Sequence, residues 1–234
     1  SRWLSLRQMR PEIGSDAYGG FVGELEGRRY RVSRVDHYVL CPFKYFAENV
    51  LNLEEERDDM AGLTPLERGN FVHDLFEKFY RGWDEQKRGT ITAANLPEAV
   101  ALFAQLTDQA LSRLAEADRV LERTRLLGSL VAPGVAERVF ELEADKGGSI
   151  VKRYLESELK GPFAFPQLGG LKTRTVDISG KADRIDVFAD GSLRVIDYKL
   201  SRLPDVKSSI QIAVYAFAAQ QWLQQQDGKS HPIA

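Results

Sequence analysis

Two carboxylates and one amine in the last third of the chain have the residue types of a hydrolytic metal site. Asp183 lies in the segment GKADRID, and Asp197 and Lys199 lie in the segment VIDYK. Both segments alternate between apolar and polar residues, which is typical of strands, and a short turn-forming stretch joins them. Whether the two aspartates can act together therefore depends on how the two strands pair.

The length of the loop between these strands decides whether the carboxylates share a face. A two-residue loop would turn Asp197 to the face opposite Asp183. A three-residue loop at 189–191, with Gly191 in the left-handed conformation of a bulge, sets Asp183 opposite Asp197 and puts Lys199 one pleat further along. That register also gathers four aliphatic side chains on the same face: Ile185, Val187, Leu193 and Val195. We therefore predict the three-residue loop.

Two carboxylates that face each other repel unless a cation lies between them. Their hard oxygen atoms suit Mg²⁺ or Mn²⁺, which would polarise a phosphodiester and lower the pKa of a bound water. Lys199 would orient that water or balance the charge that develops on phosphorus. The alternative interpretation is a surface strand that carries an ordinary pair of Asp and Lys.

Further motifs resemble the RecB-like and AddB-like branch of the PD-(D/E)XK nuclease superfamily. GKADRID and VIDYK resemble its motifs II and III, and Gln211 and Tyr215 resemble its QxxxY element. These two residues are four apart, so a helix places them on one face. The resemblance implies that Asp183, Asp197 and Lys199 are catalytic, and that the QxxxY pair binds DNA or orders the site.

Upstream, His73 lies in the segment GNFVHDLFE, which is similar to a helix of this family whose histidine reaches the metal. The resemblance implies that His73, Asp183 and Asp197 ligate the ion. The family also has a further carboxylate on the helix before the first core strand. Five glutamates compete for that position, and the sequence does not choose among them: Glu137, Glu141, Glu143, Glu156 and Glu158.

The segment VSRVDHYVLCPFKYF resembles the N-terminal motif of AddB-type nucleases, in which a cysteine is the first of four iron–sulfur ligands. In that group the other three cysteines follow the QxxxY helix, and this sequence ends at Ala234 without them. Either the cluster belongs to a longer parent chain, or Cys41 is a buried apolar residue. For the chain as given, we expect no cluster.

The elements that must position these residues are first helical and then strand-rich. We expect a strand over 30–32 and a helix that begins at a capping box of Ser33 and Asp36 and runs to about Leu51. The other expected helices cover 70–80, 95–127, 135–159 and 206–226, and the expected strands cover 173–179, 181–188 and 192–199.

This order predicts an α/β fold, and the resemblance implies a restriction-endonuclease-like PD-(D/E)XK core: a small mixed sheet flanked by helices, with a helical N-terminal subdomain. We expect a lead-in or linker over 1–29, a helical subdomain with the His motif over 30–130, and the nuclease core over 131–234.

Composition limits the class of protein further. With 234 residues and one cysteine, the chain can bury a core and forms no internal disulfide, so we expect a cytoplasmic protein. No apolar run is long enough to span a bilayer, so we expect no membrane partner. The net charge of −2 gives no global argument for nucleic-acid binding. Basic residues cluster only locally: Arg28, Arg29, Arg31 and Arg34, and then Lys199, Arg202 and Lys207.

The resemblance implies a metal-dependent DNase, exonuclease-like and active in DNA repair or recombination, whose partners are DNA and a helicase domain or subunit. The sequence has no P-loop, so it shows no motor of its own. The alternative is a catalytically inactive nuclease-like module that binds DNA or a partner protein. The sequence leaves open exonuclease or endonuclease action, strand polarity, the form of the substrate and the oligomeric state.

Overall fold

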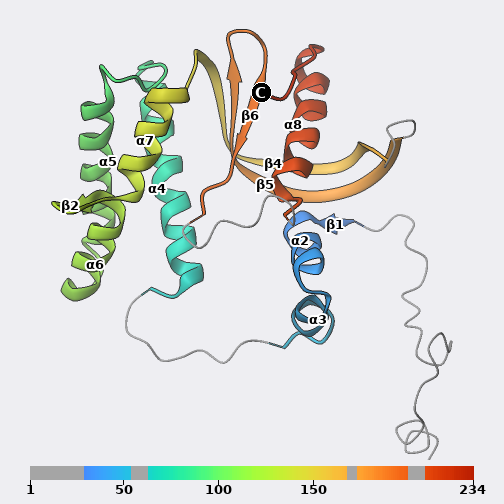
Figure 1. Cartoon of the computed structure of the whole chain (residues 1–234), viewed down its shortest axis with the longest axis horizontal. Coiled ribbons are helices and arrows are strands. Elements are labelled where there is room, and N and C mark those ends of the chain that lie inside the picture. Colours follow the sequence, from blue (N-terminus) through green and yellow to red (C-terminus); the bar gives the residue numbers. More distant parts are fainter. Residues whose placement is uncertain (1–28, 54–62, 168–172, 200–208) are drawn as a thin grey trace, which may run out of the picture.

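A long, curved pair of antiparallel strands forms the centre of the protein (Figure 1). The computed structural model describes residues 29–53, 63–167, 173–199 and 209–234. The central strands are β4 (Ile150–Pro166) and β5 (Thr173–Phe188). On the other edge of β5, β1 (Tyr30–Arg31) pairs in parallel and β6 (Leu193–Ile196) pairs antiparallel. The sheet is therefore mixed, as predicted.

The hairpin between β5 and β6 has the predicted register. Phe188 N–H donates to the Ser192 carbonyl oxygen at 2.9 Å, so the loop is 189–191, and Gly191 has a φ of +85°. A left-handed backbone of this kind favours glycine. The prediction of this register rested on four aliphatic residues, and these pack together in one core. Val195 lies at the edge of the core, and the other three are buried: Ile185, Val187 and Leu193.

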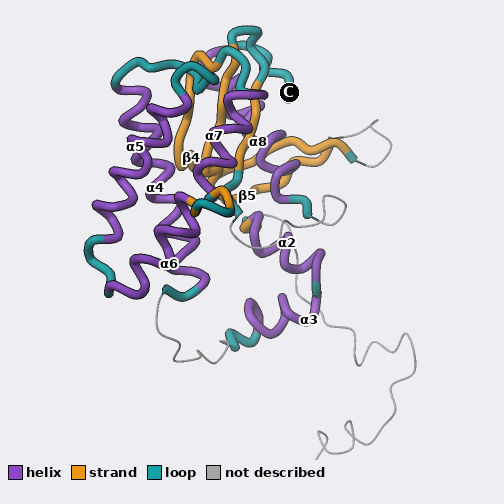
Figure 2. The backbone as a smooth tube through the Cα atoms, turned by 60° about the vertical axis from the view of Figure 1, so that its left-hand side comes forward, coloured by secondary structure: helices purple, strands orange, loops and turns teal. Residues whose placement is uncertain are grey.

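Helices cover this sheet on two sides, and each side has its own apolar core (Figure 2). One side holds the helices α4 (Pro65–Glu85), α5 (Leu96–Leu111), α6 (Glu116–Leu127) and α7 (Val135–Lys146). Their shared core is aromatic and includes Phe76, Phe79, Phe103 and Phe140. The other side holds α8 (Gln211–Asp227), which buries Tyr215 and Leu223 against β4 and β5.

Shorter elements complete the described chain. The hairpin strands β2 (Gly128–Ser129) and β3 (Ala132–Pro133) link α6 to α7. Beside β1 lie α2 (Val32–Leu40), α3 (Pro42–Tyr45) and the π-helical turn η1 (Phe46–Val50). None of the described helices is both long and apolar enough to cross a bilayer.

The helix predicted over 135–159 is wrong in its second half. α7 ends at Lys146, Gly148 has a φ of +58°, and β4 begins at Ile150. The glycine pair at 147–148 ends the helix, and the pairing of β4 with β5 over its whole length outweighs the helix-forming Lys and Glu residues that follow. The predicted helix over 95–127 is likewise two helices, α5 and α6, separated by 112–115.

Two strands predicted over 173–179 and 181–188 are one continuous strand, β5. Gly180 suggested a break, but its backbone stays in the sheet. The strand predicted over 192–199 is shorter, because β6 ends at Ile196. The last helix begins at Gln211 among the described residues, and the start predicted at 206 lies outside them.

The capping box predicted at Ser33 is also wrong. α2 starts at Val32 with no side-chain cap, and Asp36 is buried on the helix. Its carboxylate accepts hydrogen bonds from Ile210 N–H at 2.7 Å and from the Ser209 hydroxyl at 3.3 Å. Asp36 therefore ties α2 to the start of α8.

Cys41 is exposed, which contradicts the buried apolar role expected for it. The single helix expected to reach Leu51 is interrupted at this cysteine, because Pro42 cannot continue the hydrogen bonding of α2. The Cys41 sulfur accepts a hydrogen bond from Lys44 N–H at 3.4 Å and starts α3. Cys41 is thus a helix boundary residue on the surface.

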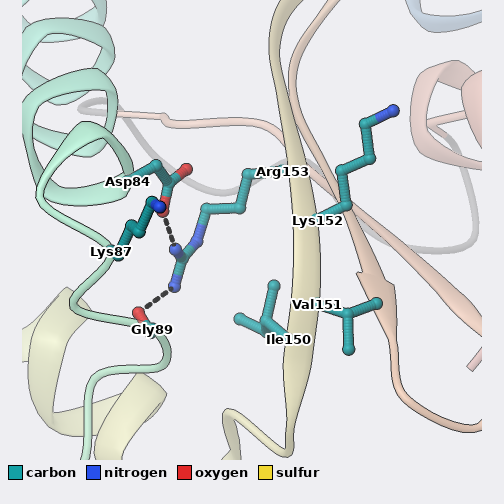
Figure 3. A pocket seen from close by; sticks show the side chains of 7 residues that line it. All are labelled: Asp84, Lys87, Gly89, Ile150, Val151, Lys152 and Arg153. Atoms are coloured by element: carbon teal, nitrogen blue, oxygen red, sulfur yellow. Dashed lines mark hydrogen bonds and ion pairs between the residues drawn. The ribbon is translucent and has the colours of Figure 1, made fainter.

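A buried ionic network joins the helices of the aromatic core to the sheet. Arg184, with no exposed surface, binds Asp186 through two hydrogen bonds of 2.6 and 2.7 Å and also binds Glu143 of α7. Figure 3 shows Arg153 reaching from β4 to the Asp84 carboxylate of α4 and to a backbone carbonyl beside it. These charges hold β4 and β5 against α4 and α7.

Candidate metal centre

Three carboxylates form a row across the sheet. In β4–β5 the pairs Leu155–Arg184 and Ser157–Ala182 flank this position, so their register places Glu156 opposite Asp183. The β5–β6 pairing ends at Arg184 and Ile196, and one more step in the same register places Asp197 opposite Asp183. Asp183 is therefore the central member of the row, with Glu156 of β4 on one side and Asp197, the residue that follows β6, on the other.

His73 approaches this row from α4. Its Nδ1 atom lies 3.3 Å from Asp183 Oδ1, and its Nε2 atom lies 3.0 Å from the Tyr198 carbonyl oxygen. Because a carbonyl only accepts, Nε2 carries a proton and donates it. The hydrogen bond to Asp183 raises the pKa of His73, against the opposing effect of burial. In the neutral ring, the remaining lone pair on Nδ1 faces Asp183 and is free to bind a cation.

His73, Glu156 and Asp183 each offer a ligand atom, and these atoms lie within 4.8 Å of one another. Two ligands on opposite sides of an octahedral Mg²⁺ are about 4.2 Å apart, since each bond is about 2.1 Å. A small contraction would thus bring the three groups onto one ion. Two carboxylates with one imidazole suit Mg²⁺ or Mn²⁺, so the donor set fits the metal expected from the sequence.

Glu156 has an unusual backbone conformation, with a φ of +50°. A positive φ is uncommon for residues other than glycine, and such conformations cluster at functional sites. The Glu156 carboxylate also forms an ion pair of 2.5 Å with Lys181 of β5. From the sequence, Glu156 was one of five candidates for the family's further carboxylate, and it was predicted to lie on a helix. The register with Asp183 becomes visible only once 150–166 is recognised as a strand.

Asp197 lies in the row but makes different contacts. Lys199 Nζ lies 2.8 Å from Asp197 Oδ2, and Gln211 Nε2 donates to Asp197 Oδ1 at 3.3 Å. Burial raises the pKa of Asp197, and the Lys199 ammonium opposes that rise. Asp197 is therefore outside the group of three converging ligands, next to the amine that the sequence paired with it.

The QxxxY pair, Gln211 and Tyr215, lies beside Asp197 and the backbone of Gly180 and Lys181. The Tyr215 hydroxyl is hydrogen-bonded to the Gln211 side chain and to the backbone of Lys181. Burial raises the pKa of Tyr215. A β-carbon on Gly180 would lie 2.4 Å from Tyr215 Cε1, which no real side chain tolerates. Gly180 is thus required because the tyrosine ring packs directly on its backbone.

The backbone of Tyr198 orients two of the candidate ligands, a role that sequence reasoning missed. Its N–H donates to Asp183 Oδ2 at 2.8 Å, and its carbonyl accepts from His73. Its ring stacks on Phe76 at 4.4 Å, and its hydroxyl accepts from Arg184 at 3.3 Å. The side chain of Tyr198 therefore anchors the segment that carries Asp197 and Lys199.

The amino-acid sequence is similar to those of known proteins. Residues 30–234 match the PD-(D/E)XK nuclease superfamily. The chain is 30% identical over 172 residues to an ATP-dependent helicase/deoxyribonuclease subunit of Lactococcus lactis subsp. cremoris, and the match covers 73% of this chain and 14% of that protein. It is also 30% identical over 207 residues to the protein of the same name from Heliobacterium modesticaldum, covering 81% of this chain and 16% of the relative.

A third relative, named exonuclease/helicase subunit RexB of Lactococcus lactis subsp. cremoris, is 29% identical over 174 residues. That match covers 73% of this chain and 14% of the relative. The chain thus spans about a seventh of the length of these relatives. The RecB-like and AddB-like resemblance and the predicted fold class are confirmed by these matches together with the mixed sheet.

Proposed function

Because the chain belongs to the PD-(D/E)XK nuclease superfamily, we propose that it hydrolyses DNA phosphodiester bonds with a divalent ion, Mg²⁺ or Mn²⁺. The observation that supports this proposal is the convergence of His73, Glu156 and Asp183 within 4.8 Å, next to the ion pair of Asp197 and Lys199. In this proposal Glu156 is the further carboxylate that the family resemblance requires, and Asp197 closes the site on the other side of Asp183.

A bound ion would polarise the phosphodiester and supply a nucleophilic water near neutral pH. The chain's own groups hold the parts in place. Tyr198 fixes the orientations of Asp183 and His73 through its backbone. Lys199 donates to the attacking water or to the phosphoryl oxygens, where negative charge develops. Gln211 holds the Asp197 carboxylate so that the amine of Lys199 stays beside the reacting group.

We further propose that the chain is the nuclease module of a helicase–nuclease, exonuclease-like and active in DNA repair or recombination. The relatives it matches are named as subunits of such assemblies. The sequence itself contains no P-loop, so unwinding would come from a helicase domain or subunit outside residues 1–234. DNA and that helicase are its proposed partners.

The test is a nuclease assay on linear and circular DNA, single- and double-stranded, with Mg²⁺, Mn²⁺ or EDTA. We expect cutting that EDTA abolishes and that Lys199→Ala lowers by about 100- to 1,000-fold, the effect of removing one group that stabilises the transition state. Lys78→Ala, an exposed lysine on α4, is the matched control and should cut normally. DNA binding without cutting under any metal would instead support the inactive module.

A further inference from the structure

A basic cleft lies beside the candidate metal centre, between β1 and α2 on one side and β4, β5 and α8 on the other. Its volume is about 820 Å³. Five basic side chains line it: Arg29, Arg31, Arg34, Lys160 and Lys181. Glu158 is the one carboxylate among its described lining residues. The chain as a whole has a net charge of −2, so this concentration of positive charge is local.

The arginines of this β1–α2 cleft differ in whether they have an ion-pair partner. Arg29 is paired with Asp177 at 2.8 Å. Arg31 and Arg34 are exposed, and their side chains have no ion-pair or hydrogen-bond partner among the described residues. An arginine without a carboxylate partner keeps its full set of donors for a phosphate. Arg31 and Arg34 therefore keep their donors for an anion that enters the cleft.

The cleft is continuous with the candidate metal centre through two of its lining residues. Lys181 lines the cleft and is ion-paired with Glu156. Tyr215 lines it too, and is bonded to Gln211, which donates to Asp197. A strand with one phosphate at the metal would thus reach the cleft with its neighbouring nucleotides.

Aromatic side chains accompany the charge. Tyr30 and Tyr45 line the cleft, and Tyr45 is supported edge-to-face by Tyr38 at 5.4 Å. Grooves that bind single strands combine basic groups for the backbone with aromatic rings on which bases stack. The cleft volume is within the range of sites for small ligands, about 300–1,000 Å³, which fits a short single-stranded segment.

We propose that the β1–α2 cleft binds the single-stranded DNA that adjoins the cleaved bond, with Arg31 and Arg34 on its phosphates and Tyr45 against a base. This inference rests on the proposed function and extends it to a second set of residues. The contacts lie away from the reacting phosphate, so they are the same in the bound and the transition state. Their loss should raise KM and leave kcat unchanged.

The test compares two double variants that lose the same charge. Arg31→Ala/Arg34→Ala removes the cleft arginines. Arg113→Ala/Arg119→Ala removes two exposed arginines, one just before α6 and one in its first turn. The helix α6 lies well apart from α2 (Figure 1). Binding of a fluorescent single-stranded oligonucleotide is measured in EDTA, so that no cutting occurs, at 50 to 200 mM salt. Circular dichroism melting checks that all variants fold.

Each phosphate contact on a single strand contributes about 0.7 to the slope of log K against log salt. The cleft variant should bind more weakly than wild type, and its slope should be shallower by about 1.4. Its affinity deficit should therefore shrink about sevenfold between 50 and 200 mM salt. The Arg113→Ala/Arg119→Ala variant should keep the wild-type slope, and Glu158→Gln should bind more tightly than wild type.

Wild-type affinity and slope in the Arg31→Ala/Arg34→Ala variant would overturn the cleft proposal, as would an equal loss in the Arg113→Ala/Arg119→Ala variant. Metal-dependent cutting by Arg31→Ala/Arg34→Ala with an unchanged KM would reject the cleft proposal and would still support the nuclease function. Wild-type protein that binds the strand but never cuts would reject the nuclease function alone.

Discussion

Two carboxylates three residues apart on β5 have opposite surroundings. Asp186 has no exposed surface, and its oxygens accept hydrogen bonds from Arg184 and, at 2.8 Å, from Arg194. Asp183 is 7% exposed and lies between the carboxylates of Glu156 and Asp197, and among the described residues the His73 ring is the one potential cation paired with its oxygens. Both residues belong to the same motif, GKADRID.

The difference shows how the same side chain takes a structural or a chemical role. A buried carboxylate whose charge is balanced by arginine has no need of a ligand, and its pairing holds elements together. A carboxylate among other carboxylates keeps an excess of negative charge that a divalent ion would remove. The charge balance around each carboxylate therefore separates the ionic network from the candidate metal centre.

The largest expected effect on stability comes from Asp186→Ala. This change leaves Arg184 buried without its main partner, and breaking a buried ion pair from one side costs about 3–5 kcal/mol. Asp183→Ala should cost much less, because it also relieves repulsion in the carboxylate row. Urea unfolding of both variants measures the difference. Equal losses of unfolding free energy would mean that Asp183 too is structural.

Asp183→Asn should remove the response to metal. A ligand that binds only the folded state at 100 times its Kd stabilises that state by about 2.7 kcal/mol. Wild-type protein should therefore melt at a higher temperature with excess Mn²⁺ than with EDTA, and Asp183→Asn should show little shift. In EDTA the variant should be at least as stable as wild type, since one negative charge of the row is gone. An undiminished Mn²⁺ shift would place the ion elsewhere.

Gly180→Ala tests the packing of the Tyr215 ring on β5, next to the candidate metal centre. Its β-carbon overlaps the Tyr215 ring, so the ring must move, at a cost of about 1–3 kcal/mol for overpacking. DNA cutting should fall as Tyr215 leaves Gln211. Gly82→Ala in α4 is the control: nothing lies within 4 Å of its new β-carbon, and it should stabilise the helix by about 0.5–1 kcal/mol. Thermal melting and the nuclease assay would show both effects.

The smallest effect is expected from Tyr198→Phe. Tyr198 contacts both the ionic network, through Arg184, and the candidate metal centre, through Asp183. The substitution removes the hydroxyl bonded to Arg184 and keeps the ring on Phe76, so it should cost about 1 kcal/mol. The backbone contacts to Asp183 and His73 remain, and cutting should change only a few-fold. A loss as large as that of Lys199→Ala would show that the hydroxyl itself takes part in the reaction.

The same variant predicts a pH dependence. Burial raises the pKa of Tyr198 to about 12 from a usual value near 10. The folded state thus holds this proton more tightly than the unfolded state, and stability falls as pH rises from about 10 to 12. Tyr198→Phe should lose less stability over this interval than wild type in denaturant titrations. Parallel curves would contradict the assignment.

The sequence predicted most of the candidate site, because its residues lie in short local patterns. The aspartate pair and the hairpin loop followed from one alternating segment and one glycine, since register on a sheet is set by burial and turn length. His73, Gln211 and Tyr215 followed from motif resemblance. The structure places His73 beside Asp183 and Lys199 beside Asp197, and their roles in metal binding and catalysis stay predictions.

Glu156 could not be selected in the same way. Its segment is rich in Lys and Glu, which favour helix in isolation, and only the long pairing with β5 makes it a strand. The role of Asp36 was missed for a similar reason, because its partners at 209–210 are far along the chain. Contacts between distant segments leave no local pattern.

By itself, then, the sequence determined the hairpin register and the family, because turn geometry, alternation and motif spacing are local properties. Only the tertiary structure decided which carboxylates of β5 and β4 meet one another and which meet arginines. Asp183 and Asp186 are alike in type and in motif. Their charge balance is set by α4, α7 and the neighbouring strands, which fold against β5 from remote parts of the chain.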